Sequence, residues 1–124
     1  MIVGIGLDVV ELERIKKIWQ RYGENFAKKI LHPLEVEQIP HENPVNFLGG
    51  RFAAKEAVVK ALGSGFSRGI AFTDICVDKL DNGRPEAHLS GKAAEQMEQL
   101  GARRIFISIS HSRHTAAAVA VLES

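Results

Sequence analysis

The chain has 124 residues, of which 45% are hydrophobic, and this size and composition are typical of one domain with its own core. Its 16 basic and 15 acidic residues leave a formal net charge of +1, which excludes the strongly basic balance expected of a general nucleic-acid-binding protein. The single cysteine excludes a disulfide framework, and no apolar run reaches the roughly 18 residues of a membrane span, so we expect one cytoplasmic domain over residues 1–124.

The N-terminal part of the chain predicts a strand followed by helices. Residues Ile2 to Leu7 are β-branched or glycine-spaced and too few for a helix, so they predict a buried strand. The next segment carries large apolar side chains at helical spacing on one face, at Leu12, Ile15, Trp19 and Tyr22. Gly23 supplies the stop, and residues 24–40 predict short helical pieces, one of which begins at Pro33.

One long helix dominates the middle of the sequence. The Asn-Pro pair at residues 43–44 is a favourable helix start, and the apolar pattern over residues 45–62 ends at Gly63. Gly49 and Gly50 each cost about 1 kcal/mol relative to alanine inside a helix. The pair therefore marks either a break or a close approach of another segment.

The C-terminal half predicts strands around one further helix. The alternating segment TDICVDKL, the turn DNGR and the segment PEAHL predict a β-hairpin over residues 73–89. A helix over residues 91–100, capped by Ser90, and strands over residues 103–110 and 115–123 complete the chain. This order predicts an α+β domain whose largely antiparallel sheet packs on the long central helix.

Two carboxylates stand out as candidates for chemistry. Asp8 ends the first predicted strand with Glu11 three residues later, which is also the spacing of a capping box, so a simple helix cap is the alternative. Glu56 lies in a mostly apolar helix, where carboxylates are rare unless they are paired or bind a metal. Its alternative role is an ion pair with Lys60, one helical turn away.

The pair Asp8 and Glu56 favours magnesium among the common metal ions. Two carboxylates are too few for a calcium cage, and there is no histidine–cysteine set for zinc. Magnesium is often held by one or two carboxylates, with substrate phosphates and waters as its other ligands. The substrate would then be phosphorylated, and Arg51, Lys55 and Lys60 on the same helix are cations that could face its phosphates.

Two further motifs are weaker. The segment GSGFSRG over residues 63–69 could present backbone N–H groups and Arg68 to an anion. It lacks the P-loop pattern, however, and by itself it favours a helix stop with a flexible connector. In the segment SISHS, Ser110 and His111 are neighbours in a predicted strand and point to opposite faces, which argues against a nucleophile–base pair. His111 is then either a surface residue or a donor to phosphate.

Three blocks in this order resemble a known family. GIGLDVVELERI, RFAAKEAVVKALGSG, and SISHS followed by an alanine-rich strand are similar to the holo-[acyl-carrier-protein] synthases, within the 4′-phosphopantetheinyl transferases. The resemblance spans nearly the whole chain. It implies Mg²⁺-dependent transfer of the 4′-phosphopantetheine arm of coenzyme A to a serine of apo acyl carrier protein, which yields adenosine 3′,5′-bisphosphate and serves fatty acid biosynthesis.

The resemblance also assigns roles to residues of this chain. It implies that Asp8 and Glu56 are the metal ligands, that Glu56 or a water it holds is the general base, and that Lys60 binds the pyrophosphate and stabilises the leaving group. The other positions that it matches to the coenzyme A site are Arg51, Gly65, His111 and Ser112. Thr115 stands where many members have an aromatic residue, so contacts from that strand are expected to differ.

Partner contacts are expected on the first helix and between subunits. Arg14, Lys17 and Arg21 recur at i, i+3 and i+7, which is either an ordinary solvated face or, given the acidic carriers of this family, a docking surface. The family tends to form trimers with the active site at a subunit boundary. The small side chains from Ala116 to Ala120 would permit close backbone approach, and we expect a homotrimer.

Two rival functions are compatible with parts of the sequence. A Mg²⁺-dependent nucleotide pyrophosphohydrolase would use the same acids and cations with water as the nucleophile, but it leaves the basic helix unexplained. A non-catalytic module that binds an acidic protein would use the basic helix, but it leaves Glu56 unexplained.

Overall fold

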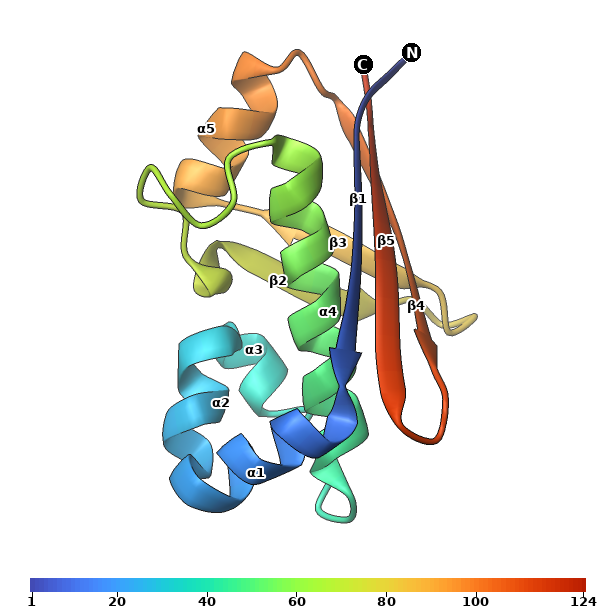
Figure 1. The fold of residues 1–124 in the computed structure, drawn as a ribbon. Helices are drawn as coiled ribbons and strands as arrows, with labels where there is room; N and C mark the ends of the chain where they lie inside the picture. Colours follow the sequence, from blue (N-terminus) through green and yellow to red (C-terminus); the bar gives the residue numbers. More distant parts are fainter.

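A three-stranded antiparallel sheet lies against one long helix in the computed structural model, which describes all residues from 1 to 124 (Figure 1). The strand order is β1-β5-β4, with bounds Ile2–Glu11 for β1, Thr115–Glu123 for β5 and Arg104–His111 for β4. The long helix is α4, Pro44–Leu62. The two termini lie side by side, because Ile2 pairs with Glu123 in the sheet.

Small residues let this sheet approach α4 closely. A Cβ atom on Gly4 would lie 2.2 Å from the carbonyl oxygen of Ala61, and one on Gly6 would lie 1.9 Å from that of Ala57. On β5, the buried side chains that alternate toward α4 are three alanines, Ala116, Ala118 and Ala120, followed by Leu122. These alanines therefore pack within the chain, whereas the sequence had connected them with contact between subunits.

The helix α4 is continuous through its glycine pair. A Cβ atom on Gly49 would lie 2.6 Å from Cδ2 of Leu12, and one on Gly50 would lie 2.7 Å from Nε2 of His111. The prediction of a close approach is confirmed, and the alternative of a helix break is wrong. Gly63 ends the helix with φ +80°, as expected of a glycine stop.

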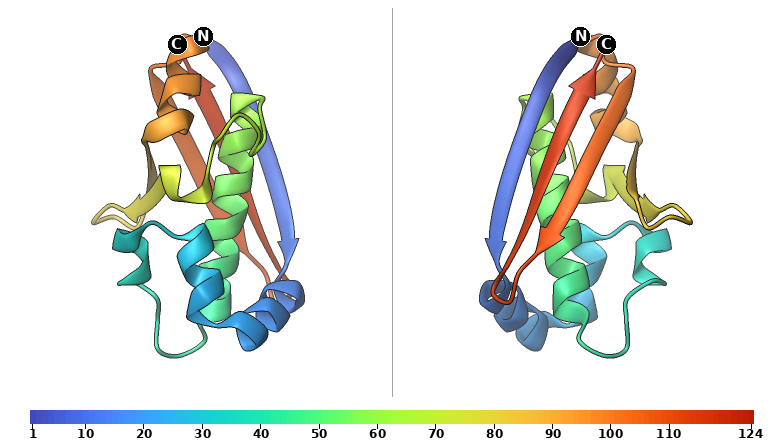
Figure 2. Two further views of the ribbon diagram at one scale, coloured as in Figure 1. Left: turned by 90° about the vertical axis from the view of Figure 1, so that its left-hand side faces the viewer. Right: turned by 90° about the vertical axis from the view of Figure 1, so that its right-hand side faces the viewer.

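Three short helices gather at the N-terminal end of α4 (Figure 2). They are α1 (Leu12–Tyr22), α2 (Glu24–Ile30) and α3 (Pro33–Val36), the last with its proline at the first helical position as predicted. Leu12 and Ile15 are buried, but Tyr22 is 52% exposed. Tyr22 is the last residue of α1, so the apolar face of this helix is buried only over its first part.

A second antiparallel sheet packs beside the first. It consists of β2 (Ile75–Lys79) and β3 (Pro85–Leu89), preceded by a short 3₁₀ helix, η1 (Phe72–Asp74), and followed by α5 (Gly91–Gln99). The predicted hairpin is confirmed, although its first residues form the 3₁₀ turn. Ser90 precedes α5, but its hydroxyl donates to the carbonyl oxygen of Asp74 at 3.3 Å and does not cap the helix.

The α+β class and the antiparallel pairing predicted from the sequence are confirmed, with two sheets where one was expected. None of the helices combines the length and the apolar composition that crossing a membrane requires.

Candidate active site

Asp8 lies within β1 and not at the start of a helix. It pairs with Ala118 of β5, and the ladder between these strands continues to Glu11, which pairs with Thr115. Glu11 is the residue before α1, and its side chain makes no capping hydrogen bond. The helix-cap alternative for Asp8 is therefore wrong, because pairing with β5 extends the strand past the position where a cap would form.

Lys60 of α4 binds Asp8. Its Nζ atom donates to Oδ1 of Asp8 at 3.0 Å and to the carbonyl oxygen of Leu7 at 2.9 Å. The alternative from the sequence, an ion pair of Lys60 with Glu56, is not formed. The side chain of Lys60 remains 50% exposed, so the ammonium group is accessible to a ligand.

Glu56 completes a small group of charges with Asp8 and Lys60. Burial raises the pKa of the half-buried Glu56 carboxyl, the negative charge of Asp8 raises it further, and the charges of Lys60 and Arg14 oppose the rise. The carboxylate has no hydrogen-bond or ion-pair partner within the chain. Two carboxylates with unfilled lone pairs thus converge at the contact of β1 with α4, next to two cations.

This donor set fits magnesium. No cluster of three or more histidine, cysteine, aspartate or glutamate side chains capable of holding a metal is present, so the protein offers no complete cage. Asp8 and Glu56 alone provide oxygen ligands of the kind that Mg²⁺ prefers and leave most of its coordination sphere to waters and substrate phosphates.

A second cation of α4, Lys55, points away from this site. Its Nζ atom is fully buried and donates to Oε1 of Glu35 at 2.5 Å and to the carbonyl oxygens of Ile30 at 2.6 Å and Phe72 at 3.2 Å. The expectation that Lys55 is available to a substrate phosphate is wrong. Positions 55 and 60 differ by five residues, which places their side chains on different faces of the helix.

Glu35 is the residue that the sequence analysis missed. It is fully buried, and its carboxylate also accepts hydrogen bonds from the backbone N–H groups of His32 at 2.8 Å and Val77 at 3.1 Å. The only signal in the sequence was local, because a glutamate three residues after the helix cap His32 completes a capping box. Its burial depends on packing of α3 against α4 and β2, which no local pattern reveals.

Arg51 is buried and restrained beside Glu35. Its side chain is 9% exposed, its Nε atom lies 3.5 Å from Oε2 of Glu35, and its guanidinium carbon lies 4.6 Å from the centre of the Phe47 ring. No hydrogen bond within the chain uses its terminal nitrogens. Arg51 therefore belongs to the same charged cluster as Lys55, but its outer amines remain free.

His111 and Ser112 lie at the turn between β4 and β5. The Nε2 atom of His111 is 2.9 Å from the carbonyl oxygen of Asn46, which can only accept, so Nε2 carries the proton. The hydroxyl of Ser112 is 2.7 Å from that of Thr115 and also accepts from the Thr115 N–H. Thr115, the departure from the family pattern, thus engages Ser112 and closes the turn.

The structure separates the predicted coenzyme A residues along α4. Asn46, which holds His111, is 14 residues before Lys60, or roughly 20 Å along the helix axis at about 1.5 Å per residue. Gly65 lies beyond the opposite end of α4, in a loop where it adopts φ +61°. A single chain therefore unites Asp8, Glu56 and Lys60, and leaves His111 and Ser112 near the other end of the helix.

The basic residues of α1 form an exposed stripe, defined as Arg14, Lys17 and Arg21. All three are exposed and none forms an ion pair within the chain. Arg14 is close enough to Glu56 to lower its pKa, so the stripe starts beside the two carboxylates. The guanidinium carbon of Arg21 lies 5.3 Å from the centre of the Tyr22 ring, so the exposed tyrosine makes a cation–π contact with the last arginine of the stripe.

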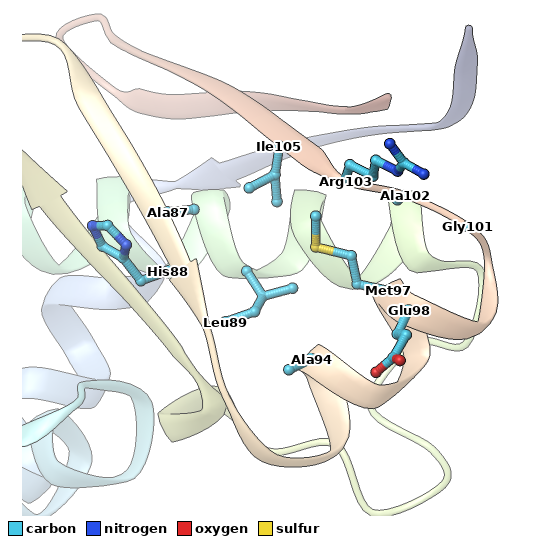
Figure 3. A pocket seen from close by; sticks show the side chains of 10 residues that line it. All are labelled: Ala87, His88, Leu89, Ala94, Met97, Glu98, Gly101, Ala102, Arg103 and Ile105. Atoms are coloured by element: carbon cyan, nitrogen blue, oxygen red, sulfur yellow. The ribbon is translucent and has the colours of Figure 1, made fainter. Parts of the chain in front are cut away.

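A separate pocket lies between β3, α5 and the start of β4 (Figure 3). Leu89, Met97 and Ile105 point into it, and Glu98 and Arg103 lie at its edge. It contains none of the residues that the sequence singled out and is distinct from the carboxylate pair.

Known proteins resemble this chain over its whole length. The model of the 4′-phosphopantetheinyl transferase superfamily matches residues 4–120. A protein of Nitratidesulfovibrio vulgaris named holo-[acyl-carrier-protein] synthase is 58% identical over 124 residues, which cover 100% of both chains.

Solved structures agree with this sequence match. The crystal structure of a holo-[acyl-carrier-protein] synthase from Neisseria meningitidis is 39% identical, with a TM-score of 0.91 and 100% of each chain covered. A Helicobacter pylori holo-[acyl-carrier-protein] synthase solved in complex with coenzyme A is 33% identical, with a TM-score of 0.84 over 96% of this chain and 99% of that one. The chain therefore belongs to the 4′-phosphopantetheinyl transferase superfamily.

Proposed function

We infer that this protein is a transferase that moves the 4′-phosphopantetheine arm of coenzyme A onto a serine of apo acyl carrier protein. The observation that carries this inference is the convergence of Asp8, Glu56 and Lys60 where β1 meets α4. Relatives named for this reaction match the chain from end to end, and one of them was solved with coenzyme A bound. The site and the family thus point to the same substrate chemistry.

The reaction is an in-line displacement at phosphorus. A bond forms between the serine oxygen of the carrier and the β-phosphorus of coenzyme A, and the bond to the bridging oxygen of adenosine 3′,5′-bisphosphate breaks. The proton of the serine hydroxyl goes to Glu56 or to a water held by it. Lys60 then supplies positive charge to the leaving phosphate, since its ammonium group is half exposed beside Asp8.

Magnesium is the cofactor in this proposal, with Asp8 and Glu56 as its protein ligands. When bound, it supplies positive charge that stabilises the pyrophosphate and the transferring phosphoryl group. Lys60 donates to Asp8, so a cation held by Asp8 would share this carboxylate with Lys60.

The remaining substrate contacts are assigned by the family resemblance. Arg51, Gly65, His111 and Ser112 line the coenzyme A site in this proposal. The terminal guanidinium nitrogens of Arg51 and the Nδ1 atom of His111 have no partner in the chain and can bind the substrate. The Ser112 hydroxyl is hydrogen-bonded to Thr115 and must give up or share that bond. The basic stripe on α1 receives the acidic carrier beside Glu56.

A homotrimer is part of the same proposal. Ile5, Leu7 and Val9 point away from α4 on the open face of the sheet and are 62%, 61% and 60% exposed, an unusual arrangement for a strand of large apolar residues. A trimer would cover this face and would bring His111 and Ser112 of one subunit to the carboxylates of another. Light scattering should give three times the mass of one chain, and a monomer at working concentration would refute it.

We place the reaction in the cytoplasm and in fatty acid biosynthesis. The transferred arm ends in a thiol, and a carrier with this thiol can hold acyl chains as thioesters. The protein would therefore activate the carrier on which such chains are extended.

One assay tests the function against its two rivals. The protein is mixed with Mg²⁺, coenzyme A and apo carrier, and the carrier is weighed by mass spectrometry, with a carrier that lacks the acceptor serine as the control. Modified carrier supports the transferase, and release of nucleotide without carrier would support the pyrophosphohydrolase. Binding of carrier with neither product would support a non-catalytic module.

A further inference from the structure

The buried charges beside α4 form one connected cluster. Glu35 comes from α3, Lys55 and Arg51 come from α4, the next helix along the chain, and the Glu35 carboxylate contacts both cations. Lys55 also binds two backbone carbonyls, so it satisfies its hydrogen bonds largely without Glu35. The contact of Glu35 with Arg51 is different, because Glu35 is the only ion-pair partner of Arg51 in the chain.

Arg51 is held on two sides and left open on the third. The Glu35 carboxylate is at its Nε edge, and the Phe47 ring covers one face of its guanidinium. The Nε atom is buried and has no hydrogen-bond partner. Its position therefore depends on attraction to the charge of Glu35. The two terminal nitrogens have no partner in the chain.

This arrangement pre-orients a phosphate-binding group. A guanidinium binds phosphate through parallel N–H donors, and that geometry is lost when the side chain rotates freely. Restraint before binding reduces the entropy that is lost on binding and therefore increases affinity. A free surface arginine would have to adopt this orientation each time a ligand arrived.

We propose that Glu35 is a positioning residue that, with Phe47, aims the guanidinium of Arg51 at a phosphate group of coenzyme A. The proposal rests on the role of Arg51 in the proposed function. Glu35 itself touches no substrate and acts only through Arg51. A purely structural Glu35 would instead stabilise the contact of α3 with α4 and leave affinity for coenzyme A unchanged.

Isothermal titration calorimetry with coenzyme A and the intact protein, together with the KM for coenzyme A, tests this. Arg51→Met should weaken coenzyme A binding by about 10- to 100-fold, the usual effect of losing charge-assisted hydrogen bonds. Glu35→Gln, which keeps the shape of the side chain but only one acceptor oxygen for the N–H groups of His32 and Val77, should weaken it by about 5- to 10-fold. In the Arg51→Met background, Glu35→Gln should have no further effect, and the KM for the carrier should stay unchanged throughout.

A second variant changes the surroundings of Arg51 without removing the carboxylate that pairs with Lys55. Phe47→Leu keeps an apolar side chain but removes the ring face, and it should raise the KM for coenzyme A by about 3- to 5-fold with the same loss of effect in the Arg51→Met background. Phe26→Leu, a change of the same size in the core of α2, is the control and should lower Tm without altering coenzyme A binding.

The outcomes separate this inference from the proposed function. If Arg51→Met weakens coenzyme A binding but Glu35→Gln and Phe47→Leu do not, only the positioning role is overturned. The same holds if Glu35→Gln or Phe47→Leu weakens binding further in the Arg51→Met background. If Arg51→Met has no effect while carrier is still modified, the assignment of Arg51 fails as well. If the wild-type protein neither binds coenzyme A nor modifies carrier, the proposed function itself fails.

Discussion

The carboxylate of Glu35, which packs against α4, and that of Glu56, which belongs to α4, have opposite surroundings. Glu35 is fully buried, and its oxygens accept from two backbone N–H groups and from Lys55 and face Arg51. Glu56 is only half-buried, yet no group in the chain hydrogen-bonds to it, and the nearby charge of Asp8 disfavours its ionised form. The more exposed carboxylate is therefore the less satisfied one.

The difference separates charges that are satisfied within the fold from charges that remain available to a ligand. A buried carboxylate whose lone pairs are filled stabilises one packing arrangement and has no capacity left for a ligand. A carboxylate held near a like charge without a partner is poised to bind a cation, and this arrangement costs stability in the ligand-free protein. Burial alone, which drew attention to Glu56 in the sequence, does not tell the two apart.

The largest effects on activity are expected from substitutions at Asp8 and Glu56. Asp8→Asn and Glu56→Gln should each lower kcat/KM for carrier modification by about 100- to 1,000-fold, because each removes a carboxylate that holds the cation in the proposed mechanism. The circular dichroism spectrum should be unchanged. Retention of full turnover by both variants, measured by mass spectrometry of the carrier, would remove Asp8 and Glu56 from the mechanism.

A non-conservative substitution of Glu35 should mainly lower stability, in contrast to the loss of activity expected at Asp8 and Glu56. Glu35→Leu leaves Lys55 without its carboxylate, and the free energy of unfolding in urea should fall by about 3–5 kcal/mol. The double variant Glu35→Leu with Lys55→Met should recover part of this loss, because it removes the buried lysine charge, while Arg51 still lacks its carboxylate. A double variant as unstable as the single one would mean that shape, and not charge, holds this cluster.

The contact that brings Asp8 to Glu56 can be tested at Gly6. Gly6→Ala would put a Cβ atom 1.9 Å from the carbonyl oxygen of Ala57, so β1 must move away from α4. We expect a loss of about 1–3 kcal/mol in stability and a lower affinity for Mg²⁺. Ser108→Ala, an exposed site on β4, is the control. Unchanged stability and metal affinity for Gly6→Ala would show that the close approach is not needed.

Charge reversal on the basic stripe should act on the carrier alone. Lys17→Glu with Arg21→Glu should raise the KM for carrier about tenfold and weaken its salt dependence, while the KM for coenzyme A stays the same. Arg14 is left intact because it also influences Glu56. Lys28→Glu with Lys29→Glu on α2 makes the same change in charge elsewhere, and an equal effect from it would argue for a general attraction without a docking surface.

The smallest effect concerns the unsatisfied charge of Glu56. Burial and Asp8 raise its pKa in the folded protein, so ionisation costs stability above that pKa, and the cost vanishes below the unfolded pKa of about 4.3. With metal chelated, Glu56→Gln should raise Tm by about 2 °C at neutral pH and by less as the pH falls toward 4. A lower Tm at neutral pH would show that the carboxylate has a stabilising partner.

The sequence by itself determined most of the elements and the two metal-binding candidates. Apolar periodicity and glycine stops identified α1, α4 and the hairpin of β2 and β3, since these signals come from neighbours within a few residues. An acid in an apolar helix marked Glu56 for the same local reason. The family blocks agreed with the pairing of Asp8 and Glu56 that the residue types had already indicated.

Only the tertiary structure decided what each charge does. Lys55 and Lys60 look alike in the sequence, but rotation of α4 buries the first against Glu35 and directs the second to Asp8. Pairing with β5 turned Asp8 from a helix cap into a strand residue. These outcomes depend on which elements pack against each face of α4, and contacts between segments so far apart leave no periodic trace in the chain.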